Sequence, residues 1–237
     1  MIDPIVNWLK EKVEETGSRG LVFGLSGGID SAVIAGLAKR AFPGNSLGLI
    51  MPCESLKEDE EDARLVAKSL DLEIEKVDLT ETYRTLLRDS FTSENRMAKS
   101  NIKPRLRMTT LYYYAQDRGY LVCGSSNASE FYIGYYTKNG DSGVDILPLV
   151  DFLKEDIFAM ARELNIPQQI IDKKPSAGLW ENQTDEMEMG FSYEQLDAHI
   201  KGEKVEEEVA EKIEYMHRVS EHKRKFAAMY KRINSNI

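Results

Sequence analysis

Residues 24 to 31 read Gly-Leu-Ser-Gly-Gly-Ile-Asp-Ser and join an apolar segment to an amphipathic one. The apolar segment, residues 21 to 25, reads Leu-Val-Phe-Gly-Leu, which is typical of a strand buried on both faces of a parallel sheet. Beyond the glycines, apolar residues at 29, 33, 34 and 37 recur at helical spacing. The stretch is therefore predicted to lead from a buried strand, through a tight loop, into a helix.

The loop has the composition of a phosphate-binding site. Gly27 and Gly28 let the backbone approach a ligand closely, and the unpaired N–H groups at a helix start attract anions. Ser26 and Ser31 add hydroxyl donors, and Asp30 puts a carboxylate where phosphates are expected, which favours Mg²⁺ between them. The alternative is a plain strand-to-helix turn with an acid near the helix start. The combination at one junction favours a magnesium nucleotide.

The loop also differs from the two commonest nucleotide loops. It lacks the G-x-x-x-x-G-K-[ST] pattern with its internal lysine, and it is not the G-x-G-x-x-G fingerprint of a redox dinucleotide fold.

The composition indicates a soluble globular protein. The 237 residues are 42% hydrophobic and 30% charged, a length and balance that suit one domain over residues 1–237. Lys and Arg number 31 against 40 Asp and Glu, and the net charge of −9 argues against a nucleic-acid partner. Without a membrane-spanning stretch or a signal peptide, we expect no membrane association and a cytoplasmic location. Cys53 and Cys123 form no C-x-x-C pair.

Strand-like and helix-like segments alternate along the first half. An amphipathic helix over residues 5–13 precedes the loop, and further strands are predicted at 47–51, 72–77 and 120–123, with a helix around 63–70. This order indicates an α/β fold with a Rossmann-like parallel sheet, helices on both faces, and ligands at the carboxyl ends of the strands. The acidic run at 58–62 is interpreted as the solvated start of a helix rather than a metal site.

Two later regions concentrate polar side chains. Residues 93–117 read as mostly helix with a basic start, and the tyrosines at 112–114 are expected in the core or at a subunit interface. After the fourth strand, Asn127 suits a helix cap. The glycine-studded stretch 134–145 mixes aromatics, a lysine and two acids, which suits a planar ligand, although a packed loop fits as well.

The last third is predicted to be helical apart from one polar stretch. A helix is expected over 153–164, and 175–190, with its solitary Trp180, is interpreted as a mobile lid. In the helical C-terminal part, 191–237, Ser192 caps a helix that runs to Ile200, and a second helix spans 209–216. The basic cluster at 221–225 is taken as a solvated tail.

The loop at 26–31 resembles the pyrophosphate loop of the N-type ATP pyrophosphatases, whose fold is adenine nucleotide alpha hydrolase-like. Nearly the whole chain resembles the ammonia-dependent NAD synthetases within that superfamily. The match is carried by Ser-Gly-Gly-Ile-Asp-Ser at 26–31, Arg-Leu-Arg-Met at 105–108, the loop 135–145, Lys-Pro-Ser-Ala at 174–177 with Asp-Glu at 185–186, and Glu-His-Lys-Arg at 221–224.

The resemblance implies an ATP-dependent amidation of deamido-NAD, the last step of NAD biosynthesis, by a carbon–nitrogen ligase. The nicotinate carboxylate is activated as an adenylate with release of pyrophosphate, and ammonia then displaces AMP to give NAD. Magnesium is implied at Asp30 and Glu130, and Asp30 and Lys154 are the implied catalytic residues. The implied ATP site comprises Gly24, Leu25, Ser26, Gly27, Gly28, Ile29, Asp30, Ser31, Ser125, Lys154 and Ser176. The implied deamido-NAD site comprises Arg105, Lys138, Asp145, His222 and Lys223.

The resemblance also implies a homodimer that uses free ammonia. Two other functions stay open from the residues alone. One is another ligase of the superfamily, such as a GMP-synthetase-like or tRNA-modifying enzyme, against which the acidic charge and the 135–145 loop count. The other is a regulatory protein that binds ATP without turning it over.

Overall fold

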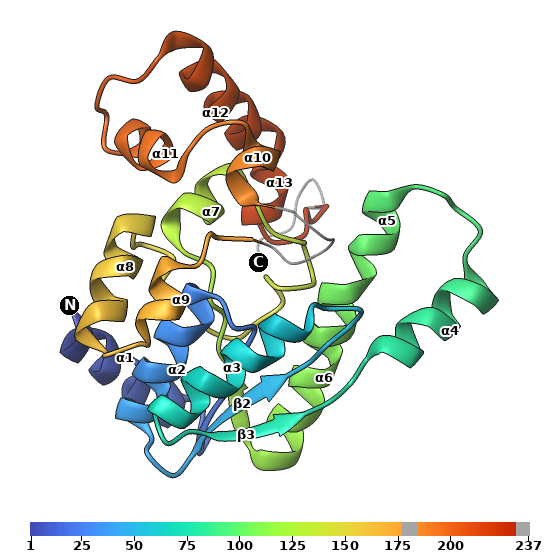
Figure 1. Cartoon of the computed structure of the whole chain (residues 1–237), viewed down its shortest axis with the longest axis vertical. Helices are drawn as coiled ribbons and strands as arrows, with labels where there is room; N and C mark the ends of the chain where they lie inside the picture. Colours follow the sequence, from blue (N-terminus) through green and yellow to red (C-terminus); the bar gives the residue numbers. More distant parts are fainter. Residues whose placement is uncertain (177–183, 231–237) are drawn as a thin grey trace.

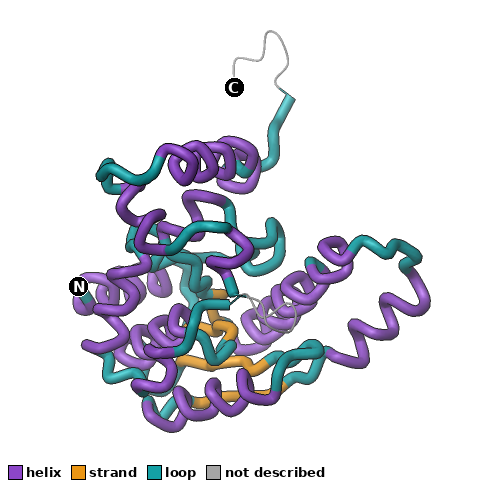
Figure 2. Tube along the Cα trace, turned by 45° about the horizontal axis from the view of Figure 1, so that its top comes forward, coloured by secondary structure: helices purple, strands orange, loops and turns teal. Residues whose placement is uncertain are grey.

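The computed structural model describes residues 1–176 and 184–230. Its centre is a parallel sheet in the order β3-β2-β1-β4 (Figure 2), with bounds Glu73–Lys76, Ser46–Ile50, Gly20–Gly24 and Tyr120–Val122. A parallel bridge between Cys123 and Ile146 prolongs the β4 edge. The sheet is the predicted one, and the phosphate loop follows a strand that has a neighbour on each side.

Helices cover both faces of this sheet (Figure 1). Their bounds are α1 Ile2–Glu15, α2 Ile29–Ala41, α3 Lys57–Ser69, α4 Thr80–Ser90, α5 Arg96–Ser100, α6 Ile102–Arg118, α7 Ala128–Ile133, α8 Lys154–Glu163, α9 Gln168–Asp172, α10 Asp185–Met189, α11 Tyr193–Ile200, α12 Glu207–Val219 and α13 Glu221–Arg224.

Alternate residues of the central strand supply two separate cores. Leu21 and Phe23 pack with α1, α2, α3, α8 and α9, whereas Val22 points to the opposite face and packs with α4 and α6. All three side chains are at most 1% exposed. This explains why the strand reads as a continuous apolar run, because a strand covered on both sides has no face left for polar residues.

A third, smaller core lies under the C-terminal helices. It joins Ile133 of α7 to Met189, Leu196 and Ile213 of α10, α11 and α12. In Figure 1 these helices form a layer above α7 and α8. The helical C-terminal part thus packs on α7, whose first turn carries Glu130.

Most of the predicted elements are confirmed. Ser192 caps α11 in a capping box with Gln195, and Gly202 follows that helix with a positive φ of 78°. The predicted helix over 93–117 is present as α5 and α6 with a break at Asn101. The residues 177–183 of the expected lid lie outside the described part of the chain, and the lid's last residues form α10.

Three features of the structure differ from the sequence prediction. Helix α4 was not predicted, and it forms with α5 an arm that projects from the rest of the chain in Figure 1. The acidic run is only partly solvated, because Asp62 is 1% exposed and pairs with Lys173 at 2.6 Å. The basic cluster is not a free tail, since it forms α13, where Arg224 donates to the carbonyls of Phe131 and Tyr132 in α7. Of the tyrosines at 112–114, Tyr114 packs against the second core, and Tyr113 is 68% exposed, so for Tyr113 the subunit interface stays the prediction. Within residues 1–176 and 184–230, no helix is long and apolar enough to span a membrane.

Candidate active site

Hydrogen bonds of Ser26 and Ser31 fix the conformation of the phosphate loop. Ser31 Oγ donates to the Gly28 carbonyl at 2.8 Å and lies 3.1 Å from Ser26 Oγ, which accepts the Gly28 N–H at 3.3 Å. Gly28 is the N-cap of α2 and has no side chain to cap it, so N–H groups of the first turn are left for a ligand. The loop is therefore pre-formed around the start of a helix, as an anion site requires.

Position 27 requires a glycine for two reasons, its backbone conformation and the atoms close to it. Its φ is +84°, and a Cβ there would lie 2.5 Å from the Asp59 carbonyl oxygen and 2.9 Å from Asp62 Cβ. Helix α3 therefore packs directly on the loop. Lys173 pairs with both Asp59 (2.9 Å) and Asp62 (2.6 Å), which ties the segment before Ser176 to the same place.

Asp30, Glu130 and Lys154 meet beside this loop, although they are far apart in the sequence. Lys154 Nζ donates to Asp30 Oδ2 at 2.7 Å and to Glu130 Oε1 at 3.2 Å. They come from the starts of α2, α7 and α8, because the three helices begin at the carboxyl edge of the sheet. The structure thus brings together the predicted catalytic and metal-binding residues.

Burial and mutual charge shift pKa values within the triad, the name used here for Asp30, Glu130 and Lys154. Lys154 is 1% exposed, and desolvation alone would lower its pKa, but the carboxylates of Asp30 and Glu130 outweigh this and raise the pKa above its usual value. The pKa of Glu130 is raised, first by burial and then by the nearby Asp30 and Asp185, while Lys154 opposes the rise. Two carboxylates therefore converge on one cation in a site with little solvent.

Asn127 has two roles at once. Its side-chain oxygen accepts the Glu130 N–H at 2.9 Å, which confirms the predicted cap of α7, and its amide nitrogen donates to Asp30 Oδ1 at 2.8 Å. The same side chain starts α7 and orients the aspartate. The sequence predicted only the first role.

A second layer of groups was not predicted as part of the site. Asp185, at the start of α10, accepts from the hydroxyl of Tyr193 at 2.9 Å and lies 3.2 Å from that of Tyr135. The Tyr193 hydroxyl is also 3.3 Å from Glu130 Oε1. Burial and these acids raise the pKa of both tyrosines, so both stay protonated as donors. The C-terminal helices are thereby bonded to the triad.

The backbone of Lys154 is fixed by a buried acid on α11. Ser129 Oγ accepts the Lys154 N–H at 3.0 Å and itself donates to Asp197, which also accepts the Glu155 N–H at 3.1 Å. Asp197 is 4% exposed. A carboxylate at the first turn of α8 satisfies otherwise unpaired N–H groups and so holds the lysine in place.

Four of the five residues expected to bind the dinucleotide gather around the stretch 134–138. Arg105 donates to the Lys138 carbonyl at 3.1 Å, and Lys138 Nζ donates to the His222 carbonyl at 2.5 Å. Lys223 Nζ donates to the carbonyls of Gly134 (2.6 Å) and Tyr136 (2.7 Å). Since Tyr135 reaches Asp185, this stretch connects the basic group to the buried triad.

Asp145 lies apart from that basic group. Its carboxylate accepts the Val122 N–H at 2.8 Å and the Tyr112 hydroxyl at 3.0 Å, at the end of β4. Burial and Asp145 raise the pKa of Tyr112 to about 12. Ser125 follows β4 and is half-buried, and Ser176 is exposed at the end of the described segment.

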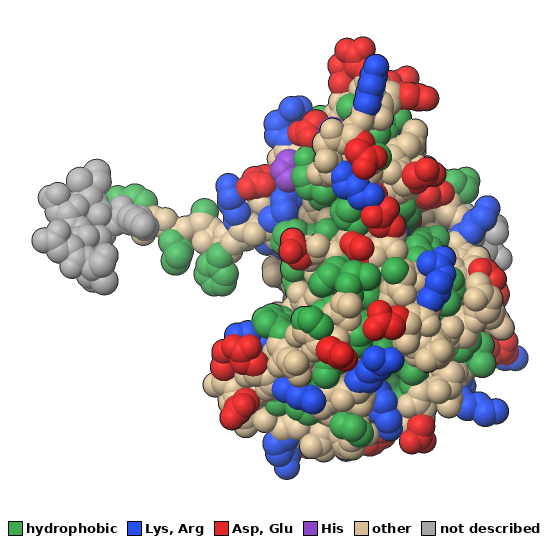
Figure 3. All heavy atoms as spheres, turned by 90° about the vertical axis from the view of Figure 1, so that its left-hand side faces the viewer, with side chains coloured by type: hydrophobic (Ala, Val, Ile, Leu, Met, Phe, Trp, Pro, Cys, Tyr) green, Lys and Arg blue, Asp and Glu red, His purple; other side chains and the backbone are tan. Residues whose placement is uncertain are grey.

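The molecular surface carries no single dominant charge on the face seen in Figure 3. Acidic and basic side chains are interspersed there. Together with the net charge of −9, this arrangement offers a polyanion no extended basic surface on that face.

Comparison with known proteins gives one consistent family. The family model described as NAD synthase matches residues 1–227. An NH(3)-dependent NAD(+) synthetase of Finegoldia magna is 54% identical over 233 residues, covering 97% of this chain and 95% of the relative. The structure of an NMN synthetase from Francisella tularensis matches with a TM-score of 0.91 and 41% identity, covering 96% of this chain and 95% of that one. An NH3-dependent NAD synthetase from Campylobacter jejuni matches with a TM-score of 0.82 and 30% identity, covering 97% of each chain.

Proposed function

The chain belongs to the NAD synthase family, and from this premise we propose that it is the ligase that amidates deamido-NAD with ammonia at the expense of ATP. The observation that carries the proposal is the meeting of Asp30, Glu130 and Lys154 beside an open phosphate loop. The family is one of enzymes, which disfavours the regulatory alternative.

The proposed reaction has two steps. An oxygen of the nicotinate carboxylate attacks the α-phosphorus of ATP, and pyrophosphate leaves with the electrons of the broken P–O bond. Ammonia then attacks the carbonyl carbon of the adenylate, the C–O bond to AMP breaks, and the nitrogen loses a proton to give the amide. Activation is needed because a free carboxylate is a poor acyl donor.

Different residues of the site would bind different phosphate groups of the two substrates. The loop 26–31 would hold the β- and γ-phosphates as the leaving pyrophosphate, because it presents N–H groups and hydroxyls. Lys154 would stabilise charge on the α-phosphate, since it is held at the loop by two carboxylates. Arg105, Lys138 and Lys223 would face the dinucleotide phosphates, with Ser125 and Ser176 on ATP.

The donor set fits magnesium. Asp30 and Glu130 already converge on one cationic atom, and Mg²⁺ in nucleotide sites uses one or two carboxylates together with phosphate oxygens. These two residues would hold the ion when ATP is present. The ion would neutralise phosphate charge, and Lys154 would then turn toward the α-phosphate.

A second candidate function is the same amidation reaction on a smaller substrate. The match to a structure named NMN synthetase favours amidation of the mononucleotide, which lacks the adenylate half. The basic group at 134–138 and 222–223 favours the dinucleotide, because it offers more cations than one phosphate needs.

Product analysis tests the proposal and separates the two substrates. With ATP, Mg²⁺ and ammonium, the purified chain should convert deamido-NAD to NAD, AMP and pyrophosphate, with a higher kcat/KM than for nicotinate mononucleotide. ADP as the product, or no amide from either acid, would refute the ligase. Preference for the mononucleotide would establish the second candidate.

We also infer a homodimer and, because ATP is the substrate, a cytoplasmic location. Exposed apolar side chains at Phe91, Met97 and Tyr113 on the arm and α6 support a subunit contact there. Light scattering at micromolar concentration should give about twice the chain mass.

A further inference from the structure

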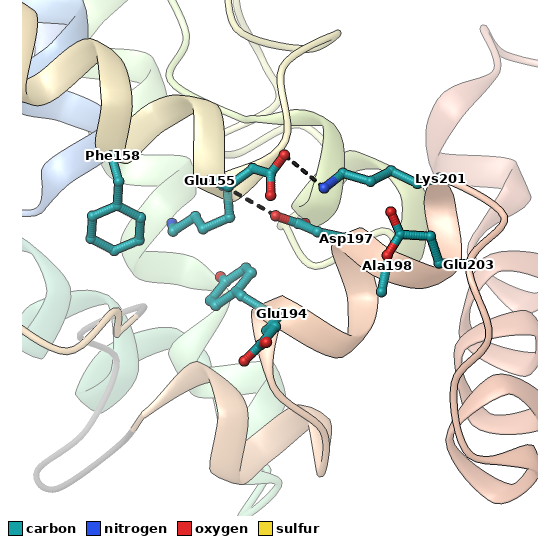
Figure 4. A pocket seen from close by; sticks show the side chains of 9 residues that line it. Glu155, Phe158, Glu194, Asp197, Ala198, Lys201 and Glu203 are labelled. Atoms are coloured by element: carbon teal, nitrogen blue, oxygen red, sulfur yellow. Dashed lines mark hydrogen bonds and ion pairs between the residues drawn. The ribbon is translucent and has the colours of Figure 1, made fainter.

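A cavity opens between α8 and α11, on the outer side of the triad (Figure 4). It has a volume of 380 Å³, and its walls include Lys154 and Phe158 from α8 and Tyr193 and Ala198 from α11. Its polar lining and its size suit several waters or a small hydrated ion. Neither the phosphate loop nor the 134–145 stretch lines it.

The inner wall of this cavity is shared with the reaction site. Lys154 Nζ lies 4.6 Å from the centre of the Tyr193 ring, and both residues line the cavity. On their other side, the same two side chains contact Glu130 at 3.2 and 3.3 Å. The cavity and the triad therefore share Lys154, and Tyr193 contacts both.

The cavity carries net negative charge. Its lining contains four carboxylates against two ammonium groups, and the carboxylates are those of Glu155, Glu194, Asp197 and Glu203. Glu155 pairs with Lys201 at 2.7 Å, and Asp197 is bonded to backbone N–H groups. Glu194 and Glu203 line the cavity, are exposed to solvent and have no salt bridge among the described residues.

An opening lined by carboxylates admits cations more readily than anions. ATP and the dinucleotide are anions, which an acidic lining repels, whereas ammonium is a small cation, which it attracts. The nucleotides would also cover the phosphate loop and the basic stretch, where both are expected to bind. A small cation needs a separate way to the adenylate carbonyl once these ligands are in place.

We propose that the α8–α11 cavity is the entrance through which ammonium reaches the reaction site, an inference that rests on the proposed function. Ammonium enters past Glu194 and Glu203 and reaches the wall formed by Lys154 and Tyr193. Conversion of the adenylate and one ammonium to the amide and AMP releases two protons, which leave to solvent.

Filling the cavity is the first test. Ala198→Phe places a ring among the lining side chains and should raise KM for ammonium, while Asn7→Phe on the exposed side of α1 should not. Adenylate formation needs no ammonia and is measured separately as deamido-NAD-dependent exchange of labelled pyrophosphate into ATP. This exchange rate should equal that of the wild type.

Removing the entrance charge is the second test, and it leaves the packing unchanged. The double variant Glu194→Gln/Glu203→Gln should raise KM for ammonium about twofold to fivefold per carboxylate, the range of exposed charge pairs. Glu207→Gln on α12, outside the cavity, is the matched control. The wild-type KM for ammonium should also rise with salt concentration.

The outcomes separate the two proposals. A raised ammonium KM with normal exchange in the charge variant supports the entrance, even where Ala198→Phe fails to fold. An unchanged ammonium KM in the charge variant overturns it, as does an equal loss of exchange and amidation. If the wild type shows no deamido-NAD-dependent exchange, the proposed function itself is refuted, and the inference fails with it.

Discussion

Replacing the buried Lys154 should show how much the stability of the folded protein depends on the pairing of Asp30 and Glu130 with a cation. Lys154→Met keeps the length and most of the volume of the side chain and removes its charge. Asp30 and Glu130 then face each other across a buried space without the cation that now bonds to both, at 2.7 and 3.2 Å. The folded state loses this attraction, whereas the unfolded chain, with its carboxylates in water, is unaffected.

The size of the effect follows from the burial of the lysine. Removing one partner of a buried ion pair typically costs about 3–5 kcal/mol, because the remaining charge is desolvated and unpaired. For a chain of this length each kcal/mol lowers Tm by about 2–4 °C, so the variant should melt about 6–20 °C below the wild type. Lys201→Met is the matched control, because its pair with Glu155 lies at the surface and should leave Tm nearly unchanged.

Urea unfolding at several pH values measures how the stability deficit of Lys154→Met depends on pH. The pKa of Glu130 is already raised in the folded protein, and without Lys154 the remaining influences all raise it further. A raised folded-state pKa means that the folded chain binds a proton more tightly than the unfolded chain. The deficit should therefore be full above neutral pH and shrink as pH falls toward the ordinary carboxyl pKa of about 4.

Two results would refute this reasoning. One is a variant as stable as the wild type at pH 8, since the lysine would then compensate nothing. The other is a deficit that is independent of pH, which would point to lost packing. Adding Glu130→Gln to Lys154→Met should recover part of the stability, because it removes one of the uncompensated carboxylates.

Three further substitutions test the loop, the metal carboxylate and the basic stretch. Asp30→Asn should lower pyrophosphate exchange by at least about 100-fold, with a smaller loss of Tm than in Lys154→Met because Lys154 keeps its bond to Glu130, and near-normal kcat at saturating Mg²⁺ would contradict its role. Gly27→Ala should cost about 2–4 kcal/mol in urea unfolding, from positive φ and overlap with α3, whereas Gly44→Ala, with nothing within 4 Å of its Cβ, should be neutral. Lys138→Met should raise KM for deamido-NAD about tenfold and leave KM for ATP unchanged, as one lost bond to a charged group implies. Lys99→Met is its control, and equal changes for both substrates would argue against a dinucleotide contact.

The parts of the fold that local sequence determines were predictable. The run at 21–25, the glycines of the loop and the period of the next helix fix a strand, a turn and a helix with little reference to the rest of the chain. The cap at Ser192 was predictable for the same reason, because the residues that make it are three apart. Helix α4 was missed because, of its residues, only Tyr83 is buried.

The second layer of the site was not predictable from local patterns. Tyr193 and Asp197 read as the start and the middle of an ordinary amphipathic helix, and their bonds to Glu130 and Ser129 exist only because α11 packs on α7 and α8. Asn127 was recognised as a cap, but its bond to Asp30 joins residues 97 positions apart. Asp185 was noted within a family motif, although no spacing connected it to Tyr135 or Tyr193.

The central claim is that the substrate carboxylate attacks the α-phosphate of ATP, and isotope transfer tests it most directly. Deamido-NAD labelled with ¹⁸O in the nicotinate carboxylate is turned over with ATP, Mg²⁺ and ammonium, and the products are analysed by mass spectrometry. The account predicts one ¹⁸O atom in the phosphate of AMP and none in pyrophosphate. Unlabelled AMP, or label in pyrophosphate or free phosphate, would contradict it.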